Sequence, residues 1–406
     1  MTAQVQETEV KSGAAGAKKF PGWDSRKYNY YEPKGRKATH YEDMTVDVQP
    51  DPERYLLQNW IISFADGTPT YYKGWTKLQS SDWHKFRAPD QEWERTHYQR
   101  QSTIEGMIKN VVDNARKSGA PSRFDQRWVK ILQDHVGAYK HAEYGLGKAT
   151  MHAQRYGYTQ MVNNAILTNS SYKLRFAQDL TLYLSEIGMD LPVFDATAGK
   201  THWLEDPVWQ GAREATEAVM GAEDYLEQYF ATNVVFEPLV AELFRSGFVM
   251  QLAAAQNDFA TPAVVSAAEA DYEQNLANTV ELFHLLAQDP EHGEANRKVM
   301  EGWLEKHGAL CVKAANQLQP VWSQPRVKAA QFTDAFAASS NRLRAICAEI
   351  GIEVPAAVAI APAAAGGALR WNSTTTSPAR CCSGAAGARG TRGGAGLARA
   401  GVAACR

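Results

Sequence analysis

Long hydrophobic runs and C-x-x-C cysteine pairs are both missing from this chain of 406 residues. No stretch approaches about 18 consecutive apolar residues, the length that a membrane-spanning helix needs. Residues 1–19 are polar, small and charged, so they lack the apolar core of a secretory signal. The five cysteines form no C-x-x-C pair, and Cys311 and Cys347 lie in apolar, helix-like surroundings typical of reduced, buried thiols. These absences predict a cytoplasmic protein that does not enter a membrane.

An excess of one charge and the common nucleotide and hydrolase motifs are also absent. The formal net charge is −2, which gives no reason to expect binding to nucleic acid or to an acidic membrane surface. The sequence has no P-loop, no G-x-G-x-x-G after a strand, no G-x-S-x-G elbow and no H-E-x-x-H. With 44% hydrophobic and 22% charged residues, the composition is that of a globular protein, for which a large protein partner stays open.

The chain divides into four zones that differ in composition and in helical periodicity. Residues 1–19 read as a disordered tail, and residues 20–89 as an extended arm rich in aromatics, Pro and Gly. Residues 90–354 have a helical pattern almost throughout. Residues 355–406 consist mainly of Ala, Gly and Arg and cannot form a core, so we expect a disordered tail without functional weight. We expect the arm, residues 20–89, to lie in an extended form on the surface of this chain or of another one.

Apolar residues at steps of three and four predict about seven helices in residues 90–354, several of them about 25–30 residues long. Gly119 and Pro121 end the first, and a later one runs from near Tyr158 to about Ile187. Asp206-Pro207 and Thr261-Pro262 are typical helix starts, because Pro is favoured in the first turn. Pro238 is expected to kink or divide a long helix. The predicted fold class is all-α, a large helix bundle without a credible sheet.

Two Glu-x-x-His pairs on predicted helices are the strongest candidates for chemistry: Glu94 with His97, and Glu281 with His284. This spacing puts a carboxylate and an imidazole on one helix face, as a carboxylate-bridged di-iron centre requires. Such a centre also needs a lone Glu on the helix before each pair.

The chain does not complete that set. No long helix precedes Glu94, and only Glu237 or Glu242 could serve the second pair, which gives half a site. His97 lies on an apolar helix face, where a core or interface histidine is the simpler interpretation. The helix with His135, His141 and Glu143 has no Glu-x-x-His. We interpret its histidines as buried side chains that are hydrogen-bonded to a carboxylate within the bundle. We therefore expect no catalytic, cofactor-binding or metal-ligating residue in this chain.

Several ordered stretches together resemble the β (small) subunit of the hydroxylase of bacterial soluble di-iron monooxygenases, closest to the propane and alkene branch. The likeness runs from about residue 20 to residue 354. Its stretches are Tyr41-Glu42-Asp43-Met44 through Pro52, Phe64-Ala65-Asp66-Gly67, His141 to Leu146, Arg175 to Asp179, Phe230 to Asn233 with Phe236-Glu237, His292 to Asn296, and Pro320 to Pro325.

The resemblance implies a ferritin-like helical fold that has lost its metal ligands, with an N-terminal arm. It implies an iron-bearing α subunit as partner in an α2β2 core, with a γ subunit in some systems. A coupling protein and a reductase with FAD and a 2Fe-2S cluster, using NADH, would complete the system. The hydrocarbon stays open among propane, short alkenes, isoprene, cyclic ethers and aromatics. Candidate anchors of the arm on the α subunit are Tyr30, Tyr31, Trp60, Phe64 and Trp75.

Two other readings make different predictions. A self-contained di-iron enzyme using both Glu-x-x-His pairs would hold about two irons in this chain alone. A helical scaffold with an unrelated partner would fold alone and have no affinity for an oxygenase α subunit.

Overall fold

The computed structural model describes residues 33, 36–46, 65–67, 72–191, 193–356 and 358. Within these residues the regular structure is entirely helical, as the apolar spacing predicted. The expected tail of residues 1–19, four of the proposed anchors (Tyr30, Tyr31, Trp60 and Phe64) and nearly all of residues 355–406 lie outside the described residues. Of the helices described, none is long and apolar enough to cross a membrane.

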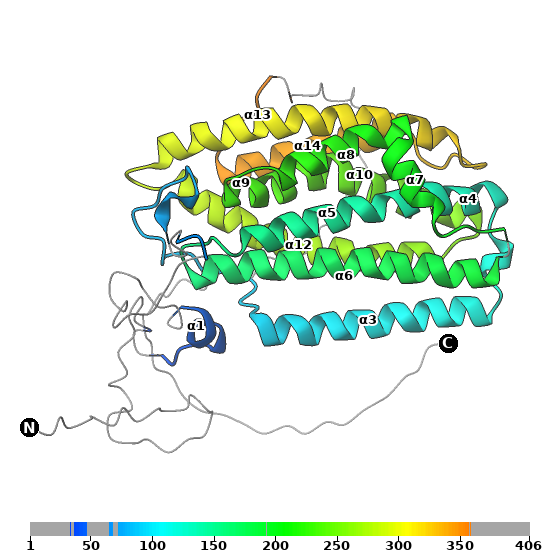
Figure 1. Cartoon of the computed structure of the whole chain (residues 1–406), viewed down its shortest axis with the longest axis horizontal. Coiled ribbons are helices and arrows are strands. Elements are labelled where there is room, and N and C mark those ends of the chain that lie inside the picture. Colours follow the sequence, from blue (N-terminus) through cyan, green and yellow to red (C-terminus); the bar gives the residue numbers. More distant parts are fainter. Residues whose placement is uncertain are drawn as a thin grey trace, which may run out of the picture. The chain divides into compact units, whose positions relative to one another are not determined.

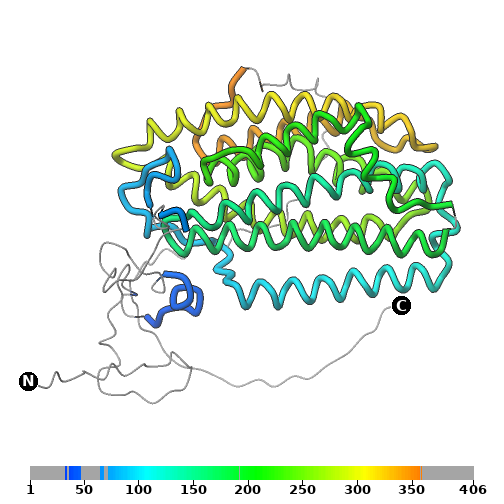
Figure 2. The backbone as a smooth tube through the Cα atoms, viewed as in Figure 1, coloured from blue at the N-terminus to red at the C-terminus, as the bar shows by residue number. Residues whose placement is uncertain are grey.

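The helices follow one another along the chain as Figures 1 and 2 show. The first half contains α1 (His40–Thr45), η2 (Lys73–Trp75), α3 (Glu94–Lys117), η3 (Pro121–Arg123), α4 (Gln126–Ile131), η4 (Leu132–Val136), α5 (Gly137–Ala153), α6 (Gln160–Asp190), α7 (Ala198–Glu205) and α8 (Pro207–Met220). The second half contains α9 (Tyr225–Phe230), η5 (Ala231–Ala241), α10 (Glu242–Phe244), η6 (Arg245–Val249), α11 (Met250–Leu252), η7 (Ala253–Gln256), α12 (Ala260–Ala287), α13 (Gly293–Leu318), η8 (Gln319–Ser323) and α14 (Phe332–Ile350).

Capping residues set several of these boundaries. The Asp206 side chain accepts a hydrogen bond from the backbone N–H of Val208, and Pro207 occupies the first turn of α8, as predicted. Helix α12 begins slightly before the predicted Thr261-Pro262 start. Its first N–H groups donate to the carboxylate of Asp258, so an aspartate rather than a threonine marks this end.

The centre of the bundle is formed by four helical segments: α5, α6, the run from α9 to η6, and α12. Helix α6 lies between α5 and α3, while α8, α13 and α14 cover the other side (Figure 1). The run from α9 to η6 is one long helical rod, but η5 and η6 within it are π-helical. Pro238 lies inside η5, so the predicted disturbance of this helix takes the form of a changed hydrogen-bond pattern.

The described end of the arm packs onto this same chain. Leu78, Trp83 and Phe86 are buried in the main core although they belong to no helix, and Ala88 donates its N–H to the Tyr41 hydroxyl (3.0 Å). Trp75 is half-buried, with its ring 5.0 Å from that of Tyr156. These aromatic side chains therefore contribute to the stability of the bundle itself.

Candidate functional site

The first Glu-x-x-His pair does not converge on a common point. Glu94 is exposed in the first turn of α3, whereas the side chain of His97 is only 1% exposed. The Nδ1 atom of His97 lies 3.0 Å from the Oε2 atom of Glu92, a residue just before the helix. Burial alone would raise the pKa of Glu92, but His97 and Arg100 lower it to about 2. His97 is thus a core histidine, the simpler of the two interpretations drawn from the sequence.

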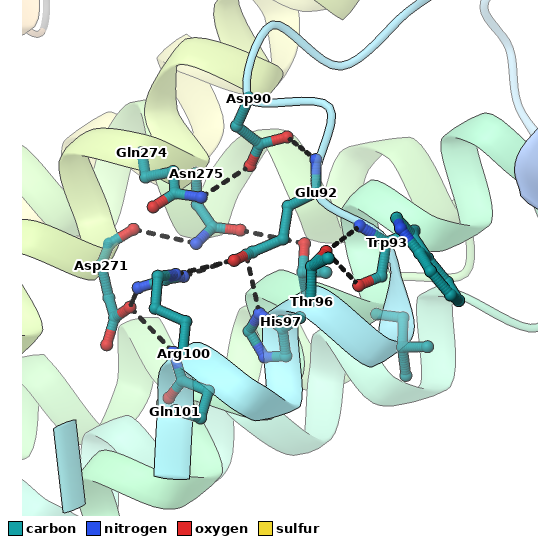
Figure 3. A network of polar contacts seen from close by, with 12 residues as sticks. Asp90, Glu92, Trp93, Thr96, His97, Arg100, Gln101, Asp271, Gln274 and Asn275 are labelled. Atoms are coloured by element: carbon teal, nitrogen blue, oxygen red, sulfur yellow. Dashed lines mark hydrogen bonds and ion pairs between the residues drawn. The ribbon is translucent and has the colours of Figure 1, made fainter. Parts of the chain in front are cut away.

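Around His97, an ionic network holds α3 against the bundle (Figure 3). Arg100 donates to Glu92 (2.7 Å) and to Asp271 of α12. Asp271 also accepts from Gln101 of α3 (2.9 Å) and from Arg175 of α6 (2.8 Å). One fully buried carboxylate therefore joins three helices.

The second pair lies at the edge of the bundle. Glu281 is half-buried and His284 is exposed, and the Nδ1 atom of His284 lies 3.0 Å from the backbone oxygen of Glu349 in α14. Neither side chain reaches the centre. Neither Glu237 nor Glu242, the lone glutamates considered for this pair, is hydrogen-bonded to it.

His135 in η4 and His141 in α5 do not have the carboxylate partners that the sequence analysis expected. His135 is buried between Gln324, 2.9 Å from its Nε2 atom, and Trp209, whose Nε1–H donates to its Nδ1 atom (3.0 Å). The expected carboxylate partner is replaced by an amide and an indole. His141 is half-buried and stacks on Trp203, and burial lowers its pKa to about 4.

The centre of the bundle holds a different cluster, in which all side chains but one are fully buried. Glu143 of α5 and Glu237 of η5 are 1% and 0% exposed, and the ammonium group of Lys173 of α6 contacts both, at 3.3 Å from Glu143 and closer to Glu237. Arg245 of η6 donates to Glu143 (2.8 Å), to Glu237 (2.7 Å) and to Glu269 of α12 (2.8 Å). We call these five residues the central ionic cluster.

Every carboxylate oxygen of the central ionic cluster already accepts a hydrogen bond. The hydroxyls of Tyr139 and Tyr172 donate to Glu143 and Glu237 and complete the set. Burial alone would raise the pKa of Glu237, but the charges of Arg245 and Lys173 hold it below its ordinary value. The charge of Glu237 is therefore balanced by side chains of the same chain.

Comparisons with known proteins agree with the helical architecture. The family model described as methane/phenol/alkene hydroxylase matches residues 60–290. The chain is 41% identical over 348 residues to the propane 2-monooxygenase hydroxylase small subunit of Rhodococcus jostii (strain RHA1), covering 86% of this chain and 95% of that one.

The chain belongs to the methane/phenol/alkene hydroxylase family. A more distant relative is the methane monooxygenase component A beta chain of Methylosinus trichosporium, 25% identical over 71% of this chain and 76% of that one. The solved structure of phenol hydroxylase from Pseudomonas sp. OX1 superposes with a TM-score of 0.68 at 16% identity, over 85% of this chain and 99% of that one. The fold is therefore the ferritin-like bundle of these hydroxylases.

A di-iron centre, which this fold family implies, does not fit the residues of this hydroxylase chain. Iron needs free carboxylate oxygens and imidazole nitrogens. In the central ionic cluster the carboxylates already have two cationic partners and no histidine is present. Within the described ranges, no group of three or more His, Cys, Asp or Glu side chains is arranged to hold a metal ion.

Sequence reasoning missed three members of this cluster: Lys173, Arg245 and Glu269. A single Lys or Arg in a helix is normally read as a surface residue. The signal that could have found Lys173 and Glu269 is their position in the order of helices, because Lys173 follows Glu143, and Glu269 follows Glu237, on the next core helix.

Proposed function

We propose that this chain is the non-catalytic β (small) subunit of the hydroxylase of a multicomponent monooxygenase. The names of its relatives, propane 2-monooxygenase hydroxylase small subunit and methane monooxygenase component A beta chain, support this role. The reaction would be the insertion of one oxygen atom from O2 into a small hydrocarbon, with propane and short alkenes as the first candidates.

The observation that carries the non-catalytic role is the saturation of the central ionic cluster. Lys173 and Arg245 both contact the carboxylates of Glu143 and Glu237 on the core helices, and a ferritin-like di-iron protein holds its iron between carboxylates of such helices. The di-iron centre of the proposed enzyme would accordingly lie in the α subunit. Electrons would come from NADH through the FAD and 2Fe-2S cluster of a reductase, and a coupling protein would join the α2β2 core, with or without a γ subunit.

The outer side of α6 supports a large partner on this face of the bundle. Between Gln160 and Ser185, about 37 Å of helix, no residue that is half-buried or exposed carries a formal charge. The residues concerned are Gln160, Asn163, Leu167, Ser171, Leu174, Gln178, Thr181, Leu182 and Ser185. Interface centres are depleted of charge in this way, whereas solvent-facing helices normally carry charged residues.

Exposed apolar side chains adjoin this uncharged stretch, and on α5 they flank one charged residue, the exposed Lys148, whose Nζ atom lies 5.7 Å from the centre of the Tyr144 ring. Leu182 is 53% exposed and Met189, one turn beyond the uncharged stretch, is 74% exposed. On the adjacent α5, Tyr144 and Met151 are 52% and 43% exposed. We propose that the α subunit covers this surface, which we call the α5–α6 face.

Co-expression with a tagged α subunit tests the proposal. In the variant Gln178→Glu/Leu182→Glu, two carboxylates replace exposed side chains of α6, so folding is preserved while the interface would have to bury unpaired charge. We expect at least a tenfold loss of co-purified chain. The control Val327→Glu changes a 47% exposed residue between η8 and α14 and is expected to co-purify like the wild type. Unchanged recovery of the double variant would contradict docking on this face.

A further inference from the structure

The central ionic cluster follows the order of a ferritin-like metal centre along the chain. Such a centre takes a lone Glu from each of two helices and a Glu-x-x-His pair from each of the other two. Here Glu143 of α5 is followed by Lys173 of α6, and Glu237 of η5 is followed by Glu269 of α12. The two lone glutamates and the glutamate of the second pair are thus present, and a lysine stands where the glutamate of the first pair would be.

The two positions that would carry histidines hold aromatic residues instead. Three residues after Lys173 stands Phe176, which is fully buried and has no donor atom for a metal. Three residues after Glu269 stands Tyr272, whose hydroxyl donates to the backbone oxygen of Asn233 (2.9 Å). Both nitrogen ligands are therefore lost, while both side chains still fill the core.

The positive charge in the cluster comes from two side chains that bridge the same carboxylates. The Lys173 ammonium lies between Glu143 and Glu237 and is 0% exposed. The Arg245 guanidinium is 1% exposed and spans Glu143, Glu237 and Glu269. In a metal-binding bundle, a pair of metal ions lies between carboxylates of different helices. The two side-chain cations lie between carboxylates of different helices in the same way.

We propose that Lys173 and Arg245 together take the place of the two metal ions, and that Lys173 keeps divalent cations out of the bundle. The internal cations offset the negative charge of the carboxylates that the arrangement of helices brings together. Without them, Glu143 and Glu237 would be buried like charges, which is strongly unfavourable. The cluster thus preserves the bundle without the metal.

The test compares the full-length wild type with Lys173→Met, Glu237→Gln and the double variant, by thermal unfolding with and without excess Mn²⁺. Methionine keeps the length of lysine but removes its charge, so Lys173→Met is expected to unfold at a lower temperature. Removing the opposing charge with Glu237→Gln is expected to restore at least half of that loss in the double variant. Lys148→Met, at an exposed position of α5, is the matched control and is expected to behave like the wild type.

Metal uptake gives the second readout. Mn²⁺ is expected to raise the unfolding temperature of Lys173→Met and to be retained by it after desalting, but not by the wild type. The proposal is overturned if the wild type retains Mn²⁺ stoichiometrically, or if Mn²⁺ affects Lys173→Met no more than the wild type. It is also overturned if the double variant is no more stable than Lys173→Met, since Lys173 would then only fill space. No α subunit is needed for these measurements, so they are independent of the docking proposal.

Discussion

Asp271 is the residue whose removal should most clearly detach α3 from the bundle. Its side chain is 0% exposed, and it accepts hydrogen bonds from Arg100, Gln101 and Arg175. The change Asp271→Asn keeps the shape of the side chain but removes the charge that attracts the guanidinium groups of Arg100 in α3 and Arg175 in α6. Figure 3 shows Asp271 beside Arg100 and Gln101.

The expected loss can be estimated from the partners that remain. Removing one partner of a buried ion pair costs about 3–5 kcal/mol. Arg100 is 27% exposed and keeps its contact with Glu92 (2.7 Å), and Arg175 keeps Asp179. Because both cations retain a carboxylate and asparagine still accepts one hydrogen bond, we expect the lower end of that range, about 3 kcal/mol. For a chain of this size, the unfolding temperature should fall on the order of 5 °C.

Calorimetry and hydrogen exchange together measure this effect. Calorimetry gives the shift in unfolding temperature, and faster exchange is expected in α3 before it appears in α5 or α6, because α3 loses its main attachment. The matched control is Asp113→Asn on α3, the helix that Asp271 is proposed to hold. Asp113 pairs with Lys109 at 3.2 Å, but the two side chains are 32% and 70% exposed, so the change should cost less than about 1 kcal/mol. If Asp271→Asn proves as mild as the control, the network does not hold α3.

Three further predictions concern other parts of the fold. Gly199→Ala would place a Cβ atom 2.2 Å from the backbone carbon of Gly137, so calorimetry should show a strong loss of stability, whereas Gly302→Ala, with open space around it, should be neutral or slightly stabilising. Burial alone would raise the pKa of Glu227, but His307 and Lys306 lower it to about 2; its stabilising contribution is therefore complete above the ordinary pKa of 4.5 and lost as the pH falls toward 2. Urea unfolding should accordingly show Glu227→Gln less stable than the wild type at pH 7, with a difference that shrinks in acid; a difference independent of pH would contradict this assignment. Burial raises the pKa of both the Cys311 and Cys347 thiols, the latter to about 12, so iodoacetamide should label the peptides that contain them only after unfolding.

The helical fold was predictable because its signals are local. Apolar spacing placed a helix from near Tyr158 to about Ile187, and α6 spans Gln160–Asp190. Asp206 caps α8 through a contact made within four residues, so the sequence alone reveals it. The expectation that Glu94 belongs to no metal site also rests on local order, since no long helix precedes it, and it stays a prediction.

The centre of the bundle was not predictable in the same way because its interactions are distant in sequence. Lys173 is stable in the core only because Glu143 and Glu237, 30 and 64 residues away, lie on either side of it. The π-helical hydrogen bonds of η5 and η6 likewise depend on packing within the bundle. Leu78 and Trp83 follow no helical period, and only the surface that they cover explains their burial.

The measurement that tests the central claim most directly is the iron content of each subunit in a co-expressed α–β complex. The complex would be purified by size-exclusion chromatography, the chains separated under conditions that retain bound iron, and iron measured in each. The account predicts iron only in the co-eluting complex and in the α subunit, with this chain iron-free. Stoichiometric iron in this chain alone would contradict it and would show that its own carboxylates and histidines form a metal centre.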